Sequence, residues 1–185
     1  HSSDDIYKMR FRSQFADGSF TGTAPITQFA KDLIALTAGK ELPALFLSGP
    51  AEWAGNSYNL DLYTYDTWKI LSFLLPGAYI NKGTSLNVRI DRDGQVDASL
   101  NSQRLAMKTN NLQNISAIFS NDGGRFTADI TSAKASLAGF AFNDSHLKFL
   151  ADSNHIGLSC SYDNHGDMEN RGELVINGGL LRKDD

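Results

Sequence analysis

Hydrophobic and polar residues alternate along most of the chain with a period of two, the pattern of strands that have one buried and one exposed face. The clearest case is the stretch 86–100, in which two alternating runs flank Asp93-Gly94. Because Asp-Gly readily supplies the positive φ of a tight turn, we predict a β-hairpin here. A one-residue slip would turn every apolar side chain outward, so we expect Leu86, Val88, Ile90, Val96, Ala98 and Leu100 to share one concave face.

The same alternation recurs from residue 7 to residue 176, with Gly, Asn and Asp turns at short spacing. Asp17-Gly18 is predicted to turn the chain after the first strand. Turns this closely spaced are typical of an antiparallel meander. The apolar positions of these further strands include Tyr58, Leu60, Leu62, Leu105, Met107, Phe126, Ile130, Leu137, Phe149, Ile156 and Leu158.

Two stretches have a helical period instead. The first is predicted over about 25–38, with Pro25 near its first turn and Gly39 after it. The second is predicted over about 67–75, with Asp66 or Thr67 as its cap and Pro76-Gly77 as its end. Each carries one apolar stripe, so each is expected to lie on an end of the sheet.

The polar face of the strands is strongly polar, which predicts a sheet with one surface in water and one hidden. A second sheet, closure into a barrel, or a ligand held by a curled open sheet could each hide the apolar face. We expect the first and last strands to be open edges. In a longer parent chain they would pair with strands upstream of Ile6 and downstream of Leu180.

Length, charge and cysteine content narrow the function. The chain has 185 residues, a net charge of −4 and a single cysteine, Cys160. The charges are interspersed, so no nucleic-acid partner is expected, and one cysteine allows neither an intrachain disulfide nor a cysteine-based zinc site. No apolar run reaches the roughly 20 residues of a membrane span. His1 stands where an initiator Met would be, so we interpret the chain as an excised piece of a longer protein.

The polar residues suggest no active site. Residues 91–94 place Arg89 and Leu100 where a calcium loop needs oxygen ligands, so this stretch is predicted to be a turn. The acidic and His residues at 163–169, and the pair His146 and His155, are expected to be solvated surface groups. We therefore predict no catalytic residue, no metal and no cofactor.

A family resemblance rests on five stretches: 15–24, 61–67, 74–80, 83–85 and 102–107. Together they resemble the mid-region of TamB-like translocation and assembly proteins of the AsmA-like superfamily. The resemblance implies a taco-shaped (U-shaped) sheet whose concave face is apolar and conducts phospholipid acyl chains between the inner and outer membrane. It also implies a role in outer-membrane protein assembly, a periplasmic location, an inner-membrane anchor helix outside this chain, and an Omp85-class partner that binds elsewhere in the parent.

The resulting expectation is a single β-rich domain over residues 1–185, mainly an antiparallel meander with two short helices. Its lipid-binding groove is expected to be formed by Tyr58, Leu60, Leu62, Leu86, Val88, Ile90, Val96, Ala98, Leu100, Leu105, Met107, Phe126, Ile130, Leu137, Phe149, Ile156 and Leu158. A charge in such a groove should cost little stability, whereas a closed core would lose several kcal/mol. The alternative is a closed β-sandwich that binds a glycan or a protein through Trp53, Tyr63, Tyr65 and Trp68.

Overall fold

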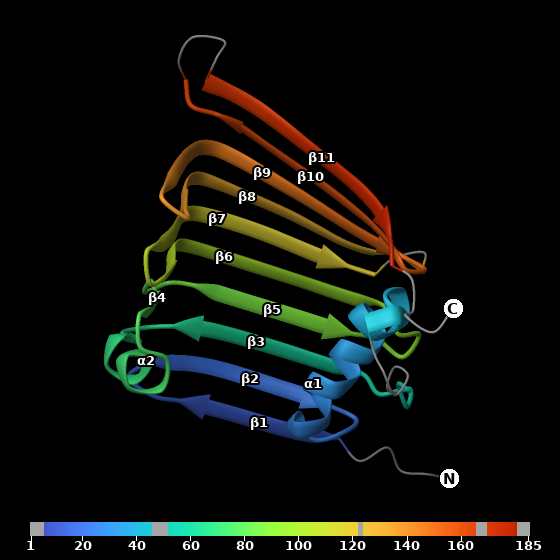
Figure 1. Cartoon of the computed structure of the whole chain (residues 1–185). Coiled ribbons are helices and arrows are strands. Elements are labelled where there is room, and N and C mark those ends of the chain that lie inside the picture. The colour runs from blue at the N-terminus through green and yellow to red at the C-terminus, as the bar shows by residue number, and fades with distance from the viewer. Residues whose placement is uncertain (1–5, 46–51, 122–123, 166–169, 181–185) are drawn as a thin grey trace.

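The computed structural model of the protein describes residues 6–45, 52–121, 124–165 and 170–180. Its strands form one open, antiparallel, 11-stranded sheet in the order β1-β2-β3-β5-β6-β7-β8-β9-β10-β11, with β4 paired to β6. Figure 1 shows these strands side by side in a single twisted layer, with α1 across it near one end and α2 at the other end. The predicted mainly-β antiparallel fold with two short helices is confirmed.

The strands are β1 Tyr7–Arg12, β2 Ala16–Gly22, β3 Tyr58–Thr64, β4 Ala78–Ile80, β5 Ser85–Ile90, β6 Val96–Met107, β7 Asn110–Ser120, β8 Phe126–Leu137, β9 Phe140–Asp152, β10 His155–Asp163 and β11 Arg171–Gly179. The helices are α1 Ile26–Ile34, which continues as the π-helix η1 Ala35–Gly39, the short 3₁₀ helix η2 Pro43–Leu45, and α2 Trp68–Leu74.

The hairpin of β5 and β6 has the predicted register. Leu86 lies opposite Leu100, Val88 opposite Ala98 and Ile90 opposite Val96, so the six side chains share one face. Residues 91–95 form the turn, in which Gly94 has a φ of 80°. The Asp91 carboxylate accepts hydrogen bonds from the backbone N–H groups of residues 93 and 95, both at 2.9 Å.

The first turn differs from the prediction. Asp17-Gly18 lies inside β2, opposite Arg12 and Phe11, and the chain turns earlier, at Ser13. The Ser13 hydroxyl accepts hydrogen bonds from the N–H groups of Phe15 and Ala16, at 3.1 and 3.0 Å. This side-chain-to-backbone turn competes successfully with the Asp-Gly signal, because a serine can complete a turn with no residue at positive φ.

Helix α1 packs its apolar stripe on the sheet, as predicted. Phe29 and Leu36 are buried against Phe20, Tyr58 and Ile90. The rings of Phe20, Phe29 and Tyr58 lie within 5.4–6.1 Å of one another, two of the three pairs being edge-to-face. This contact closes a conventional core over β2, β3, β5 and the start of β6.

Beyond α1, the chain continues along the same end of the sheet as far as the β9–β10 turn. The Asn121 amide donates to the carbonyl oxygens of Leu36 and Gly94, at 3.1 and 2.9 Å. Asn154 accepts from the N–H of Ala44 and donates its own N–H to the carbonyl of Glu41. These bonds fix the α1–η2 segment across strands that are far apart in sequence.

Among the described residues, Glu41 is the buried side chain of this segment whose hydrogen bonds are incomplete. Its side chain is buried, and its Oε1 atom has no hydrogen-bond partner. Desolvation raises the pKa of this carboxyl above its ordinary 4.5, against the weaker opposing charge of Lys40. An acid with a raised pKa in the folded state keeps its proton while the unfolded state loses it, so stability falls as the pH rises above 4.5.

We therefore expect Glu41→Gln to be more stable than the wild-type protein at neutral pH. The difference should shrink to nothing below pH 4.5, where the carboxyl is protonated in both states. Thermal melting of both proteins across this range measures it. Equal melting temperatures at neutral pH would show that Glu41 carries no desolvation penalty.

Helix α2 departs from the expectation that it lies on the sheet. Trp68, Ile70, Phe73 and Leu74 are all exposed. Thr67 is the N-cap residue but makes no capping bond, because its hydroxyl donates instead to the carbonyl of Ile80 at 2.8 Å. The helix contacts β4, which is too short to cover its apolar stripe.

The sheet ends in two open edges, as predicted: within the described residues β1 pairs only with β2, and β11 only with β10. The β11 edge is exposed and apolar at Leu174, Val175 and Ile176, whereas β1 carries Lys8 and Arg10. An apolar edge invites pairing with another strand.

We expect concentration-dependent self-association in analytical ultracentrifugation, weakened by Val175→Lys. A lysine on an edge strand opposes pairing with a second chain. The matched control is Thr131→Lys, on the same polar face but in the central strand β8, where association should be unchanged. A monomer at all concentrations would contradict the prediction.

Candidate functional site

Apolar residues line up from strand to strand across the whole sheet. Residues directly opposite in neighbouring antiparallel strands lie on the same face, so the pairings can be followed from β1 to β11. We define the Phe20 row as Met9, Phe20, Leu60, Val88, Ala98, Phe119, Ala128, Phe149, Leu158 and Ile176. It contains an apolar residue in every strand of the path.

A second row runs beside it, two residues along each strand. We define the Leu100 row as Phe11, Gly18, Leu62, Leu86, Leu100, Ala117, Ile130, Leu147, Cys160 and Leu174. This row also lacks a charged or strongly polar member. At a strand spacing of about 4.8 Å, each row spans roughly 43 Å across the ten strands.

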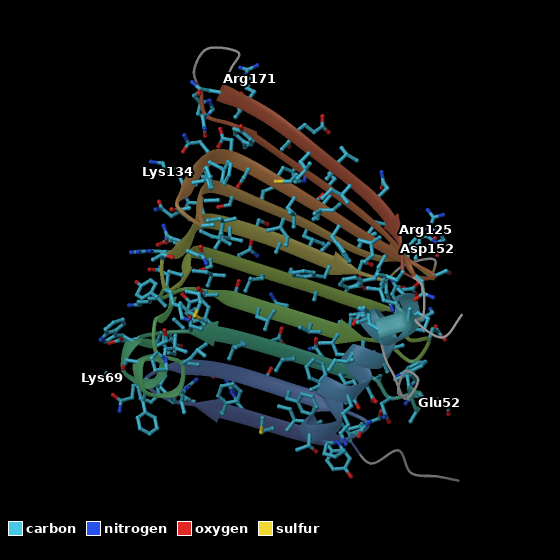
Figure 2. All side chains as sticks on the ribbon, viewed as in Figure 1. Glu52, Lys69, Arg125, Lys134, Asp152 and Arg171 are labelled. Atoms are coloured by element: carbon cyan, nitrogen blue, oxygen red, sulfur yellow. The ribbon has the colours of Figure 1, made fainter. Side chains whose placement is uncertain are left out.

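The opposite face of the sheet is mostly polar beside the Leu100 row. The row adjacent to the Leu100 row on that face consists of Arg10, Ser19, Asp61, Asn87, Ser99, Ile118, Asp129, Lys148, Ser159 and Val175. Figure 2 shows side chains standing on the strands throughout the sheet. The alternation seen in the sequence thus separates an apolar face from a polar one.

Helix α1 divides the apolar face into two parts. Over β2–β6 it buries Val88, Ile90 and Val96, whose exposed fractions are 5%, 1% and 1%. Further along the rows, Ile130 and Leu158 are half-buried, and Leu174 on β11 is exposed. Among the described residues, the cover from α1 therefore does not extend along the rows over β8–β11.

Most of the predicted groove residues lie on this face. Leu60, Val88, Ala98, Phe149 and Leu158 belong to the Phe20 row, and Leu62, Leu86, Leu100 and Ile130 to the Leu100 row. Tyr58, Ile90 and Val96 lie on the same face, two residues beyond the Phe20 row, with Ile90 opposite both Tyr58 and Val96. Phe126 and Ile156 also lie two residues beyond that row, and both are opposite Ala151.

Leu105, Met107 and Leu137 lie apart from the rows, beyond a break in the ladder. The break crosses four strands at Gln103, Asn114, Ala133 and Asp144, where no paired position is formed. Asn114 and Asp144 have a positive φ there, which glycine tolerates best and asparagine and aspartate next. The hydroxyls of Ser102 and Ser132 bond to the backbone at the break, each donating to a carbonyl oxygen two residues later.

The sequence reading omitted several members of the two rows. Met9, Phe11, Phe119, Leu147, Leu174 and Ile176 follow the alternation and could have been included on that signal. Ala128 and Cys160 also follow the alternation, whereas Gly18 and Ala117 carry too little hydrophobic side chain to be recognised without the pairing. The register alone places Gly18 and Ala117 in the Leu100 row.

Aromatic rings gather on the uncovered part of the apolar face. The ring centroid of Phe126 lies 6.5 Å from that of Phe119, in a stacked arrangement, and 6.2 Å from that of Phe149, in an edge-to-face arrangement. These three side chains come from β7, β8 and β9. They form a continuous apolar surface with the adjacent part of the Phe20 row.

The aromatic platform of the alternative function is not assembled. Tyr63 and Tyr65 contact each other, with ring centroids 5.4 Å apart. Trp53 packs against the core beneath α1, close to Gly94. Trp68 lies on α2, at the opposite end of the sheet (Figure 1). A closed sandwich also requires a second sheet, and the described strands form a single one.

The polar candidates for chemistry lie apart from one another. His146 bonds to Asp129 at 2.8 Å on the polar face, while His155 lies at the start of β10 opposite Asp152. His165 pairs with Asp144, and residues 166–169 of the same loop lie outside the described residues. The described part of the chain gathers no group of three His, Cys, Asp or Glu side chains suited to a metal ion.

Comparison of the chain with protein-family models, with curated proteins and with solved structures finds no match. Within the described ranges, no helix has the length and apolarity needed to cross a membrane.

Proposed function

We propose that this protein is a segment of a β-groove that holds and conducts the acyl chains of phospholipids. The observation that carries the proposal is the pair of apolar rows, which continue from β1 to β11 without a charged member. A path for an acyl chain must be apolar along its whole length. Two adjacent rows perpendicular to the strands meet this requirement.

An apolar surface of this kind suits a cargo that moves. Hydrophobic attraction is non-directional and scales with the area removed from water, at about 25 cal/mol per Å² or 0.8 kcal/mol for each buried CH₂ group. An acyl chain can therefore shift along the rows and exchange one contact for an equal one. Directional hydrogen bonds would instead hold it in place.

The uncovered part of the rows, over β8–β11, is the part best suited to contact lipid. Ile130, Leu147 and Leu158 are only half-buried there, and Leu174 and Ile176 are exposed at the edge. Under α1 the Phe20 row already packs against protein. We assign the lipid surface to the Leu100 row and to the part of the Phe20 row beyond β6.

The same proposal extends to the parent protein. A TamB-like role would place this segment in the periplasm, between an inner-membrane anchor and an Omp85-class partner bound by other parts of the parent. Transport of phospholipid and support of outer-membrane protein assembly are both compatible with that role. The resemblance in the sequence supports this extension.

Two measurements test the groove. Organic extraction of the purified protein followed by mass spectrometry should release phospholipid. A photo-reactive residue replacing Leu147 on the apolar face should crosslink to phospholipid, and one replacing Thr131 on the polar face should not. Absence of lipid, or equal crosslinking from both faces, would overturn the proposal.

A further inference from the structure

We propose that α2 and the corner that follows it bind the surface of an anionic lipid bilayer. The contact is independent of the apolar rows, because α2 lies at the end of the sheet opposite α1 (Figure 1). It goes beyond the conduction of acyl chains, since a protein can hold lipid in a groove without touching a membrane.

The apolar side chains of α2 are unusually exposed. The exposed fractions are 59% for Trp68, 84% for Phe73, 65% for Leu74 and 48% for Leu75. In α1, by contrast, Phe29 of the apolar stripe is buried against the sheet. Four large apolar side chains exposed within eight consecutive residues mark an interaction site.

The surrounding structure holds α2 in this exposed position. Thr67 bonds to the carbonyl of Ile80 at 2.8 Å, and the N–H of Ala78 donates to the carbonyl of Leu75 at 3.0 Å. After the helix, Gly77 adopts a φ of 86° and its carbonyl accepts the N–H of Lys108 at 2.7 Å. The apolar side chains are thus presented at a braced corner between β3, β4 and the β6–β7 turn.

Three lysines lie on or next to the elements that form this corner. Lys69 lies on α2 itself, and Figure 2 shows it at the end of the sheet that carries the helix. Lys82 follows β4, and the Lys108 stem approaches Gly77. Asp66 is the acidic residue next to the helix, where its carboxylate accepts the N–H of Trp68 at 3.3 Å.

This combination fits the headgroup region of an anionic bilayer. Tryptophan is favoured at the membrane–water interface, and lysine can keep its charge in water while its stem lies along apolar surface. The whole chain has a net charge of −4 and would be repelled by anionic lipid. A basic corner around an apolar helix therefore orients the protein with α2 towards the bilayer.

A second copy of the chain fits this surface less well. A helix of seven residues is about 10 Å long, which is too short to supply the roughly 800 Å² per partner of a stable interface. A bilayer needs no matching surface, because its interior accommodates apolar side chains of any shape that insert.

The test is flotation of the full chain with vesicles of phosphatidylcholine containing phosphatidylglycerol, compared with phosphatidylcholine alone. We expect binding to the anionic vesicles, at least tenfold weaker binding to the neutral ones, and a blue shift of tryptophan emission. The double variant Phe73→Ser/Leu74→Ser should lose at least tenfold in binding. The control, Ile118→Ser, removes an apolar residue that is 59% exposed on the polar face of the sheet and should bind as the wild type.

Circular dichroism and thermal melting show whether the double variant remains folded. Trp68→Phe supplies a second readout, because it should abolish the blue shift while binding persists. Failure of the wild-type protein to float, or flotation unchanged in the double variant, would overturn the proposal. So would a concentration-dependent dimer that Phe73→Ser/Leu74→Ser dissolves, because α2 would then bind a second copy. Extraction of lipid from the double variant distinguishes this proposal from the groove, whose lipid content should be unaffected.

Discussion

Val88→Asp is expected to destabilise the protein by at least about 4 kcal/mol, whereas Ile130→Asp should cost less than about 1.5 kcal/mol. Both residues belong to the apolar rows, and both are central in their strands. Val88 is 5% exposed and packs in the core beneath α1, so its replacement buries an unpaired charge. Ile130 lies beyond the cover of α1 and is half-buried, so a carboxylate there can reach water.

Chemical denaturation of the two variants measures this contrast. Thr131→Asp, next to Ile130 but on the polar face, gives the cost of the same charge in the same strand without the loss of an apolar side chain. A loss at Ile130 equal to that at Val88 would mean that the rows are covered beyond α1, and an open lipid surface would be untenable. A small loss at Val88 would contradict the closed core instead.

The contrast also revises what the sequence alone suggests. Strict alternation treats Val88, Ile130 and Leu158 as equivalent groove positions, for which a charge should be tolerated equally. Alternation reports which face a side chain occupies but not what covers that face. The cover comes from α1, whose contact with β2–β6 is a long-range packing event that no local pattern encodes.

Fold class and register were predictable because a period of two leaves little freedom once turns are placed. The positive-φ turns at Asp93-Gly94 and at Ser153-Asn154 fix the pairing of their hairpins. Asp17-Gly18 shows the limit of this signal, since the same dipeptide lies inside a strand when a serine three residues upstream of β2 completes the turn.

The helices illustrate a second limit. Both have an apolar stripe, and helical periodicity assigns both to a buried surface. Whether the stripe is buried depends on how much of the sheet the helix contacts. Helix α1 packs over four strands, whereas α2 contacts the three-residue strand β4. The sequence therefore does not predict that the apolar side chains of α2 are exposed.

The contact between α1 and the sheet should depend on one buried carboxylate. Asp32 is 1% exposed, and its oxygens accept hydrogen bonds from Gln28 at 2.8 Å, Asn56 at 2.8 Å and the Tyr58 hydroxyl at 2.6 Å. Asp32→Ala leaves three donors without their acceptor, so we expect a loss of roughly 3–5 kcal/mol. Asp61→Ala is the matched control, because Asp61 lies on the polar face with bonds of 3.3 and 3.4 Å, and it should change stability by less than about 0.5 kcal/mol.

Tyr58→Phe tests the same cluster from the sheet side. It removes a single hydrogen bond to a carboxylate, which corresponds to about 1.5–3 kcal/mol.

Desolvation, and next the bond to Asp32, raise the pKa of the Tyr58 hydroxyl well above its ordinary 10.0. The unfolded state then releases its proton while the folded state keeps it, so this residue lowers stability as the pH rises above 10.0. Denaturation of Tyr58→Phe should not show this loss of stability at alkaline pH. The loss of unfolding free energy caused by Tyr58→Phe should largely vanish in an Asp32→Ala background. Additive losses in the double variant would mean that the two side chains stabilise the protein independently, and that the carboxylate does not hold α1 to the sheet through Tyr58.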